Sequence, residues 1–247
     1  VYLDSRGVFV REGNAYRKMP VEGITRLHAV GGEVWGTCGG GCGARRILPE
    51  PGKALTKAGG LIDDRVTIVS GASSGTLFFS YDQQLDLGVS ALSGTTWTHY
   101  SPAISPLASG RVAELAPDAG GGLWVRYARD RLGVARIAGG QAVNYTTANS
   151  ALPYDTVELV VPEPPDVGLP GNQVWLVTVD GLTLFDPEKG EWKHYGRKHG
   201  DATDFLRMTG MDSLFSGAIT GINGVASTTG NVWISTRTRI HRFDGAT

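Results

Sequence analysis

The chain has 247 residues, of which 36 are glycine and 12 are proline, and charged residues make up 19% of it. Because glycine and proline favour turns and weaken helices, this composition predicts short strands joined by tight turns rather than a helical protein. The net charge is −1, from 23 Lys and Arg against 24 Asp and Glu, so nothing favours binding to nucleic acid or to an anionic membrane. No run approaches the roughly 18 apolar residues of a membrane span, so we expect no membrane insertion by this segment.

The N-terminal residues resemble the last three strands of a repeated unit. Residues 3–10 predict a hairpin, and the turn Glu12-Gly13-Asn14 leads into a further strand over 15–19. The chain begins without an initiator methionine or a signal-peptide pattern. We therefore expect it to be a piece of a longer protein.

The second unit is predicted to have four strands. Its strands are expected at 24–30, 33–37, 44–48 and, with a poor pattern, 53–57. Between the second and third strands lie Cys38 and Cys42, the only cysteines, separated by three glycines. A disulfide is feasible if the turn brings their Cα atoms within about 7 Å, and free thiols are the alternative.

Four further units follow. The third and fourth units, with four strands each, pass through the following positions: Arg65, Phe79, Val89 and Tyr100, then Arg111, Trp124, Val134 and Tyr145. The fifth begins at Thr156, carries a proline-rich insertion over 162–170 and ends with three strands within 172–195. The sixth begins near Ile219 and ends without an outer strand, which gives 22 predicted strands in all.

A tryptophan-centred strand recurs along the chain. It appears around Trp35, Trp124, Trp175 and Trp233, and in a weaker form around Phe79, at spacings of 44 and 45 residues from Trp35 to Trp124. Units of about 40–45 residues with four short strands are typical of a β-propeller. We predict one all-β propeller domain over residues 1–247, with units at 1–20, 21–60, 61–104, 105–150, 151–200 and 201–247. Six blades are expected, and seven blades or a longer array are the alternatives.

Two phrases carry a resemblance to a known family. The stretches 149–157 (Asn-Ser-Ala-Leu-Pro-Tyr-Asp-Thr-Val) and 174–186 (Val-Trp-Leu-Val-Thr-Val-Asp-Gly-Leu-Thr-Leu-Phe-Asp) resemble the two-component regulator propeller repeat, and residues 233–244 are similar to it as well. In that family the repeats form propellers in the sensing parts of hybrid histidine kinases and related bacterial surface proteins. The resemblance implies a periplasmic or extracellular scaffold, with a cytoplasmic location as the alternative, and it specifies no activity.

A ligand site is predicted on one rim of the propeller. The turns between second and third strands and the connections between units emerge there, together with the long connection 196–218. The predicted ligand-binding residues are Arg6, Asp82, Arg129, Asp130, Arg131, Asp180, His199, Asp201 and Arg237. Mixed arginine and aspartate favour a polar ligand that forms hydrogen bonds. The insertion 162–170 is expected on the opposite rim.

Three functions are consistent with this pattern. The first is a non-catalytic, sensor-type propeller that binds a small polar ligand, a glycan or a protein partner. The second is a propeller lyase or hydrolase with acid–base residues among Arg129, Asp130, Asp180 and His199. The third is an assembly module of a larger complex. No spacing of His, Cys or carboxylates supports a metal site, and no motif indicates a cofactor or a catalytic residue, so an enzyme is the less favoured interpretation.

Overall fold

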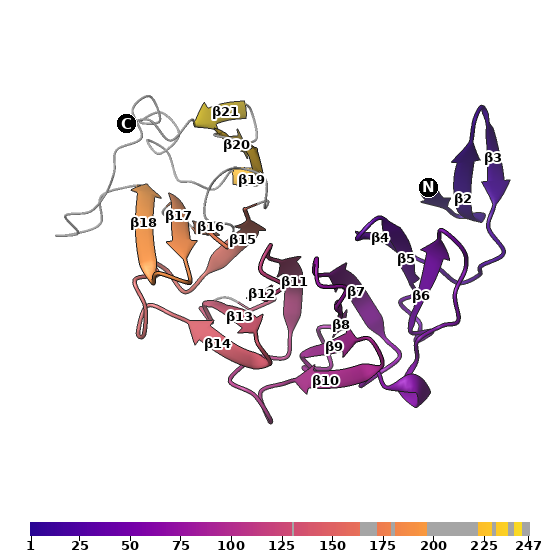
Figure 1. Ribbon diagram of the computed structural model, residues 1–247, viewed down its shortest axis with the longest axis horizontal. Helices are drawn as coiled ribbons and strands as arrows, with labels where there is room; N and C mark the ends of the chain where they lie inside the picture. The colour runs from indigo at the N-terminus through magenta and orange to yellow at the C-terminus, as the bar shows by residue number, and fades with distance from the viewer. Residues whose placement is uncertain are drawn as a thin grey trace. The chain divides into compact units, whose positions relative to one another are not determined.

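The structure is a computed structural model, and it describes residues 1–129, 131–163, 172–178, 181–196, 222–228, 231–236 and 240–243 (Figure 1). The chain divides into two compact units, Val1–Leu115 and Ala116–Thr247. Residues 164–170 of the predicted proline-rich insertion and residues 197–218 of the predicted long connection lie outside the described residues. Each unit is described by itself below.

The first unit contains three antiparallel sheets of consecutive strands. The first sheet has β1 (Tyr2–Asp4), β2 (Gly7–Glu12) and β3 (Ala15–Lys18); the second has β4 (Arg26–Val30), β5 (Glu33–Thr37) and β6 (Ala44–Leu48); the third has β7 (Val66–Gly71), β8 (Leu77–Tyr81), β9 (Val89–Ser93) and β10 (Thr96–Tyr100). A short 3₁₀ helix, η1 (Lys57–Gly59), connects the second sheet to the third. Strands β4 and β7 contact each other, so adjacent sheets meet through their first strands.

The second unit repeats this arrangement; strand β11 crosses the division between the units and is described here. Its first sheet has β11 (Val112–Pro117), β12 (Leu123–Tyr127), β13 (Val134–Ala138) and β14 (Gln141–Tyr145); the next has β15 (Val157–Pro162), β16 (Val174–Thr178), β17 (Gly181–Asp186) and β18 (Glu191–Gly196); the last has β19 (Ile222–Thr228), β20 (Asn231–Thr236) and β21 (Ile240–Phe243). Strand β15 contacts both β12 and β19.

The prediction of an outer strand over 53–57 in the second unit is wrong. Only one isolated bridge forms there, in which Leu55 and Ala44 exchange two backbone hydrogen bonds of 2.7 and 3.0 Å. Pro49 and Pro51 precede the segment, and proline lacks the amide hydrogen that a strand ladder needs. The described residues accordingly contain 21 strands rather than 22.

Aromatic and aliphatic side chains fill the space between the second and third sheets. Strand pairing makes Phe78, not Phe79, the equivalent of Trp124. In each of these sheets one residue of the second strand pairs with the first residue of the third strand, and Phe78 and Trp124 each lie two residues before that paired residue. Phe79 instead faces the second sheet, where its ring meets Trp35 edge-on, with 6.3 Å between centroids. Both side chains belong to a buried cluster, so the repeated aromatics serve packing between sheets, as their residue type predicts.

The second unit uses the same kind of packing. Trp124, which is fully buried, meets the ring of Phe185 at 5.9 Å from the adjacent sheet. Tyr145 also contacts Phe185, at 4.9 Å, and Trp192 at 6.0 Å. These aromatic contacts join the sheet β11–β14 to the sheet β15–β18 and stabilise the unit beyond simple burial of area.

A glycine with positive φ stands at the entry to the third strand of the repeat in the first five of the six sheets. The five positions are Gly7, Gly43, Gly88, Gly133 and Gly181, with φ values of 126°, 74°, 88°, 71° and 142°. At Gly43 and Gly133, an added Cβ would lie within 1.9 Å of a backbone carbonyl oxygen, that of Leu55 or Tyr145. Only glycine fits such a position, both for its φ and for the close approach of the neighbouring backbone.

These observations establish an all-β chain of antiparallel sheets with three or four strands each. The described residues contain one short 3₁₀ helix and no α-helix. The prediction of repeated units with four-stranded sheets is confirmed for three of them. The closure of six sheets into one propeller stays a prediction.

Candidate functional site

Three turns in the first unit, each leading into a third strand of the repeat, line two pockets. Pocket A has a volume of about 930 Å³ and is lined by residues of the first and second sheets, including Arg6 and Cys42 from these turns. Pocket B, of about 700 Å³, is lined by residues of the second and third sheets, including Gly39 and Asp82. Three residues predicted on the rim, Arg6, Cys42 and Asp82, therefore do line pockets at the corresponding edges of the sheets.

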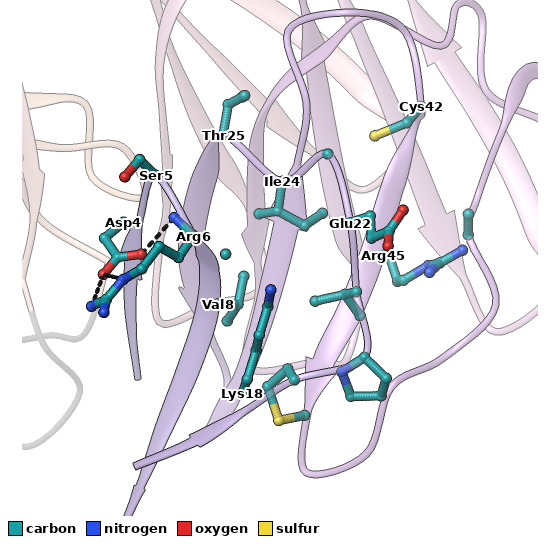
Figure 2. A pocket seen from close by; sticks show the side chains of 16 residues that line it. Asp4, Ser5, Arg6, Val8, Lys18, Glu22, Ile24, Thr25, Cys42 and Arg45 are labelled. Carbon is teal, nitrogen blue, oxygen red and sulfur yellow. Dashed lines mark hydrogen bonds and ion pairs between the residues drawn. The ribbon is translucent and has the colours of Figure 1, made fainter.

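Pocket A carries a fixed ion pair and a lysine (Figure 2). Arg6 donates two hydrogen bonds to Asp4 Oδ2, from Nη2 at 2.7 Å and from Nε at 3.1 Å, and its backbone N–H donates to Oδ1 at 2.8 Å. The side-chain hydrogen bond from Arg6 lowers the pKa of the Asp4 carboxyl, and the same bond raises the pKa of Arg6. Figure 2 shows the Lys18 ammonium directed into the pocket.

The inner wall of pocket A is apolar. Val8, Met19 and Val21 are almost fully buried and pack with Ile47 in the cluster between the first and second sheets. Ile24 packs against the same cluster and lines the pocket. The pocket thus combines a rigid apolar base with charged groups at its mouth, which is the usual composition of a site for a small molecule.

Pocket B is lined mainly by polar side chains. Its lining includes Thr25, Arg26, Thr37, Gly39, Arg65, Thr67, Asp82, Gln83 and Gln84. Arg65 is bound to Asp63, with its Nε 3.0 Å from Oδ1. The side-chain hydrogen bond of this pair lowers the pKa of Asp63 and raises that of Arg65. Asp82 accepts the backbone N–H of Gln84 at 3.0 Å, which fixes the β8–β9 turn.

Thr25 belongs to both pockets and is held by the disulfide-bearing turn. Its backbone N–H donates to Thr37 O at 2.8 Å, and its hydroxyl accepts the Gly39 N–H at 3.1 Å. In the same turn Cys38 and Cys42 form a disulfide with an S–S distance of 2.07 Å and a Cα–Cα distance of 5.8 Å. The turn therefore forms the boundary between pocket A and pocket B.

Three histidines occupy half-buried positions in the sheets, where each ring contacts a hydroxyl group. His28 Nε2 lies 3.1 Å from the Thr37 hydroxyl, behind the wall of pocket B. His99 Nδ1 lies 2.8 Å from Ser90 Oγ, and His194 repeats this contact in the second unit with the Thr183 hydroxyl at 3.0 Å. Burial lowers the pKa of His99, and burial together with the charge of Arg26 lowers the pKa of His28.

Lowering the pH from 8 to 5.5 should destabilise the protein. Because the folded-state pKa values of His28 and His99 lie below the ordinary value, the unfolded chain takes up protons first as the pH falls. The stability present above pH of about 6.5 is then lost progressively as the pH falls through the lowered values. The midpoint of urea unfolding, followed by tryptophan fluorescence, should decrease, and the decrease should be smaller in the double variant His28→Asn, His99→Asn. An equal decrease in both proteins would assign the pH dependence to other groups.

The remaining predicted ligand-binding residues are not brought to pockets A and B by any described contact. Asp130, Asp180, His199, Asp201 and Arg237 lie outside the described residues, as does most of the connection 196–218. Arg129 and Arg131 are exposed in the second unit, in the turn between β12 and β13, where the Arg131 N–H donates to the Thr156 hydroxyl at 3.3 Å. Their role in ligand binding stays a prediction.

Several lining residues were absent from the sequence-based prediction. Lys18 lies at the end of β3, and Thr25 and Arg26 lie at the start of β4. In an antiparallel sheet the start of the first strand and the end of the fourth lie at the same edge as the turn between the second and third. The alternating direction of successive strands could therefore have identified these lining residues, because it places Lys18 and Arg26 on the predicted rim.

No group of three or more His, Cys, Asp or Glu side chains in the described part of the chain could hold a metal ion. Across the same ranges, no helix has the length and apolar character required to cross a membrane.

Comparisons with known proteins give matches among solved structures. No protein-family model matches the sequence, and no curated protein matches it. The extracellular domain of BT4673, a proposed hybrid two-component system of B. thetaiotaomicron, has a TM-score of 0.54 at 14% identity, over 90% of this chain and 26% of that one. The extracellular domain of a second such system, BT3049, gives 0.51 at 16% identity, over 86% and 25%.

A third structure has a related fold. PorZ, a bacterial surface component of the type-IX secretion system of Porphyromonas gingivalis, has a TM-score of 0.55 at 12% identity, over 88% of this chain and 32% of that one. The chain thus spans between a quarter and a third of the length of these three proteins. At this level of identity the likeness concerns the fold alone. The chain has the propeller-type fold of repeated antiparallel sheets found in the extracellular domains of two-component-system proteins.

Proposed function

We propose that this protein is a non-catalytic, sensor-type binding module that takes a polar ligand on the rim formed by pockets A and B. One observation carries the proposal. Turns from three successive sheets supply Arg6, Cys42 and Asp82 to two pockets that share Thr25. A rim assembled from several repeats is where a propeller scaffold presents variable residues, and loops positioned by a rigid scaffold commonly carry binding function.

The chemistry of the lining supports a polar ligand. Hydroxyl and amide groups from Thr25, Thr37 and Gln84 line pocket B beside charged side chains. Such groups offer both donors and acceptors, so they favour a ligand with several hydrogen-bonding groups over an apolar one. The volumes of about 930 and 700 Å³ each lie in the range of small-molecule sites.

The matches to extracellular domains of two-component systems support a location outside the cytoplasm, periplasmic or extracellular. In those proteins the domain is part of a signalling system, and the same arrangement is the proposal for this chain. As a separate part of the proposal, the six sheets over residues 1–247 are the blades of one six-bladed propeller. A cytoplasmic location is the alternative.

A ligand screen by thermal shift tests the proposal. Sugars, amino acids and nucleotides are added to the intact chain, because a ligand that binds only the folded state raises the melting temperature. Hits are then measured by calorimetry on the variant Gln84→Ala, which removes an exposed amide from pocket B. A ligand bound on this rim should lose affinity at least fivefold.

The matched control is Ser74→Ala. Ser74 is also an exposed turn residue of the third sheet, but it lies in the β7–β8 turn, at the other end of β8. Its replacement should leave affinity unchanged. Equal affinity in Gln84→Ala and Ser74→Ala would place the ligand elsewhere, and a folded protein that responds to no ligand would count against a binding module.

A second function, protein–protein assembly, is favoured by the outer face of the first sheet. The rings of Tyr2 and Phe9 stack at 5.1 Å, and Tyr16 meets Tyr2 edge-on at 5.2 Å while remaining 58% exposed. In the third sheet the equivalent of Tyr16 is Trp97, which packs against the buried cluster shared with the second sheet. An exposed aromatic group of this kind is typical of a surface that contacts another protein, although in a closed propeller this face would pack against the last sheet. Light scattering over a range of concentrations on wild type and Tyr16→Ser would detect self-association through it.

The enzyme alternative has no described arrangement in its favour. Of its four candidate residues, only Arg129 lies in the described ranges, where it is exposed in a turn. The alternative therefore stays a sequence-based hypothesis. If the protein converted a ligand found in the screen into products detected by chromatography, that result would support the enzyme alternative.

A further inference from the structure

The charged side chains of the two pockets have an excess of positive charge. Five cationic side chains line the pockets, against three carboxylates: Arg6, Lys18, Arg26, Arg45 and Arg65, against Asp4, Glu22 and Asp82. The whole chain, in contrast, has a net charge of −1. Positive charge therefore exceeds negative charge among the lining side chains, and such an excess attracts ligands of the opposite sign.

Two of the five cations are already satisfied by carboxylates. Arg6 is bound to Asp4 at 2.7 Å, and Arg65 to Asp63 at 3.0 Å. Among the described residues, Lys18, Arg26 and Arg45 take part in no ion pair of this kind. The charge of these three groups is not compensated by a paired carboxylate.

Lys18 and Arg26 serve different pockets. The stem of Lys18 crosses the backbone at Gly7, where an added Cβ would lie 3.1 Å from Lys18 Cε, and its ammonium is directed into pocket A (Figure 2). Arg26 is exposed at the first residue of β4 and lines pocket B. Thr25, adjacent to Arg26 in sequence, lines both pockets. A ligand that contacts both cations must therefore pass the Thr25 position.

We propose that the ligand of this rim carries at least two oxyanion groups, one held by Lys18 in pocket A and one by Arg26 in pocket B. This inference rests on the proposed binding function and specifies the chemistry of its ligand. The guanidinium of Arg26 offers paired donors that match a carboxylate, sulfate or phosphate, whereas the ammonium of Lys18 acts as a point charge. The hydroxyl of Thr25, which lines both pockets, then binds the uncharged part between the two groups, and the amide of Gln84 contacts the part of the ligand that lies in pocket B.

Calorimetry at low salt with matched anionic and neutral probes tests the inference on the intact chain. The anionic probes are inorganic sulfate, citrate and the linear trisaccharide of galacturonic acid; the neutral probe is the linear trisaccharide of galactose. At least one of the probes with several carboxylates should bind, more tightly than sulfate and the neutral trisaccharide. Its affinity should fall as the salt concentration rises, because exposed charges are screened. Citrate and the acidic trisaccharide separate a compact ligand from an extended one.

Two variants assign the cations. Lys18→Gln and Arg26→Gln should each weaken binding of the anionic probe at least fivefold, and the double variant should weaken it further. The control is Arg17→Gln, which removes a cation from the same strand as Lys18 at a position outside pocket A, where Arg17 pairs with Glu12 at 2.7 Å. The control should change affinity less than twofold.

The remaining outcomes separate this inference from the proposed function. Equal weakening by all three single variants would show a nonspecific charge effect and overturn the inference. Binding of a neutral ligand that depends on Gln84, without binding of any anionic probe, would overturn the inference and leave the binding function intact. A protein that binds neither class of probe would contradict both.

Discussion

Replacing Gly88 with alanine should be among the most destabilising single substitutions in this protein. Gly88 has a φ of 88°, and an added Cβ would lie 2.0 Å from the backbone oxygen of Tyr100. Neither the strain of the left-handed conformation nor the contact with the backbone can be relieved by moving a side chain. We expect a loss of about 3 kcal/mol or more in the free energy of unfolding. Urea unfolding followed by tryptophan fluorescence measures it.

Gly94→Ala is the control for this substitution. Gly94 stands at the other end of strand β9 with a φ of 59°, but an added Cβ would meet no atom within 4 Å. Its replacement should therefore cost only the backbone strain, about 1 kcal/mol. Equal losses at Gly88 and Gly94 would show that the close approach of Tyr100 contributes nothing.

Asp118→Asn should cause the second large loss. The Asp118 side chain is fully buried and forms an ion pair with Arg136, whose Nη2 lies 2.7 Å from Oδ2. It accepts hydrogen bonds from Arg136 Nε at 2.8 Å and from the Gly122 N–H at 2.7 Å. Arg136 in turn lies over the ring of Trp124, 5.8 Å from its centroid. Removing the negative charge leaves Arg136 without compensation in a mostly buried position. Such a change costs about 3 kcal/mol, which should appear as a lower melting temperature.

Glu12→Gln provides the comparison at the surface. The pair between Glu12 and Arg17 has a similar length, 2.7 Å, but both side chains are more than half exposed. Water screens such a pair, so the substitution should change stability by less than about 1 kcal/mol. A loss as large as that of Asp118→Asn would mean that burial does not determine the strength of these ion pairs.

The repeats could be predicted from the sequence because each repeat has the same packing requirement. Trp35 and Trp124 lie two repeats apart and each packs in a cluster between adjacent sheets, and the strands around these residues and around Trp175 form as predicted. The same argument misplaced the Phe79 position by one residue. Two adjacent phenylalanines face opposite sides of a strand, and only the register, which is set by the partner strand, determines which one matches the tryptophans.

The outer strand predicted at 53–57 shows where local pattern is insufficient. A repeat of four strands implied a strand there, although Pro49, Pro51 and Gly52 immediately precede the segment. In this segment only Leu55 pairs with another strand, through a bridge to Ala44, and the chain then enters η1. Repetition predicts the existence of a unit better than it predicts the completeness of each unit.

The candidate site was predicted only in part, for a geometric reason. Turn residues such as Arg6 and Asp82 are recognisable in sequence because turns have a distinctive composition. Lys18 and Arg26 lie inside strands, at their ends, and no local feature separates them from other exposed strand residues. Their position at the rim depends on strand direction within the sheet. A site made of strand ends therefore requires the topology before it can be recognised.

The glycine at the entry to the third strand in the first five sheets has a consequence for how such a protein diverges. The turns that precede Gly7, Gly43, Gly88 and Gly133 contain two, five, six and five residues, yet the strand that follows begins in the same way in each repeat. The positive φ at the glycine allows the third strand to begin with the same backbone conformation after a turn of any of these lengths. Insertions, deletions and new side chains can thus accumulate ahead of it without disturbing the sheet, so recognition can evolve independently of stability.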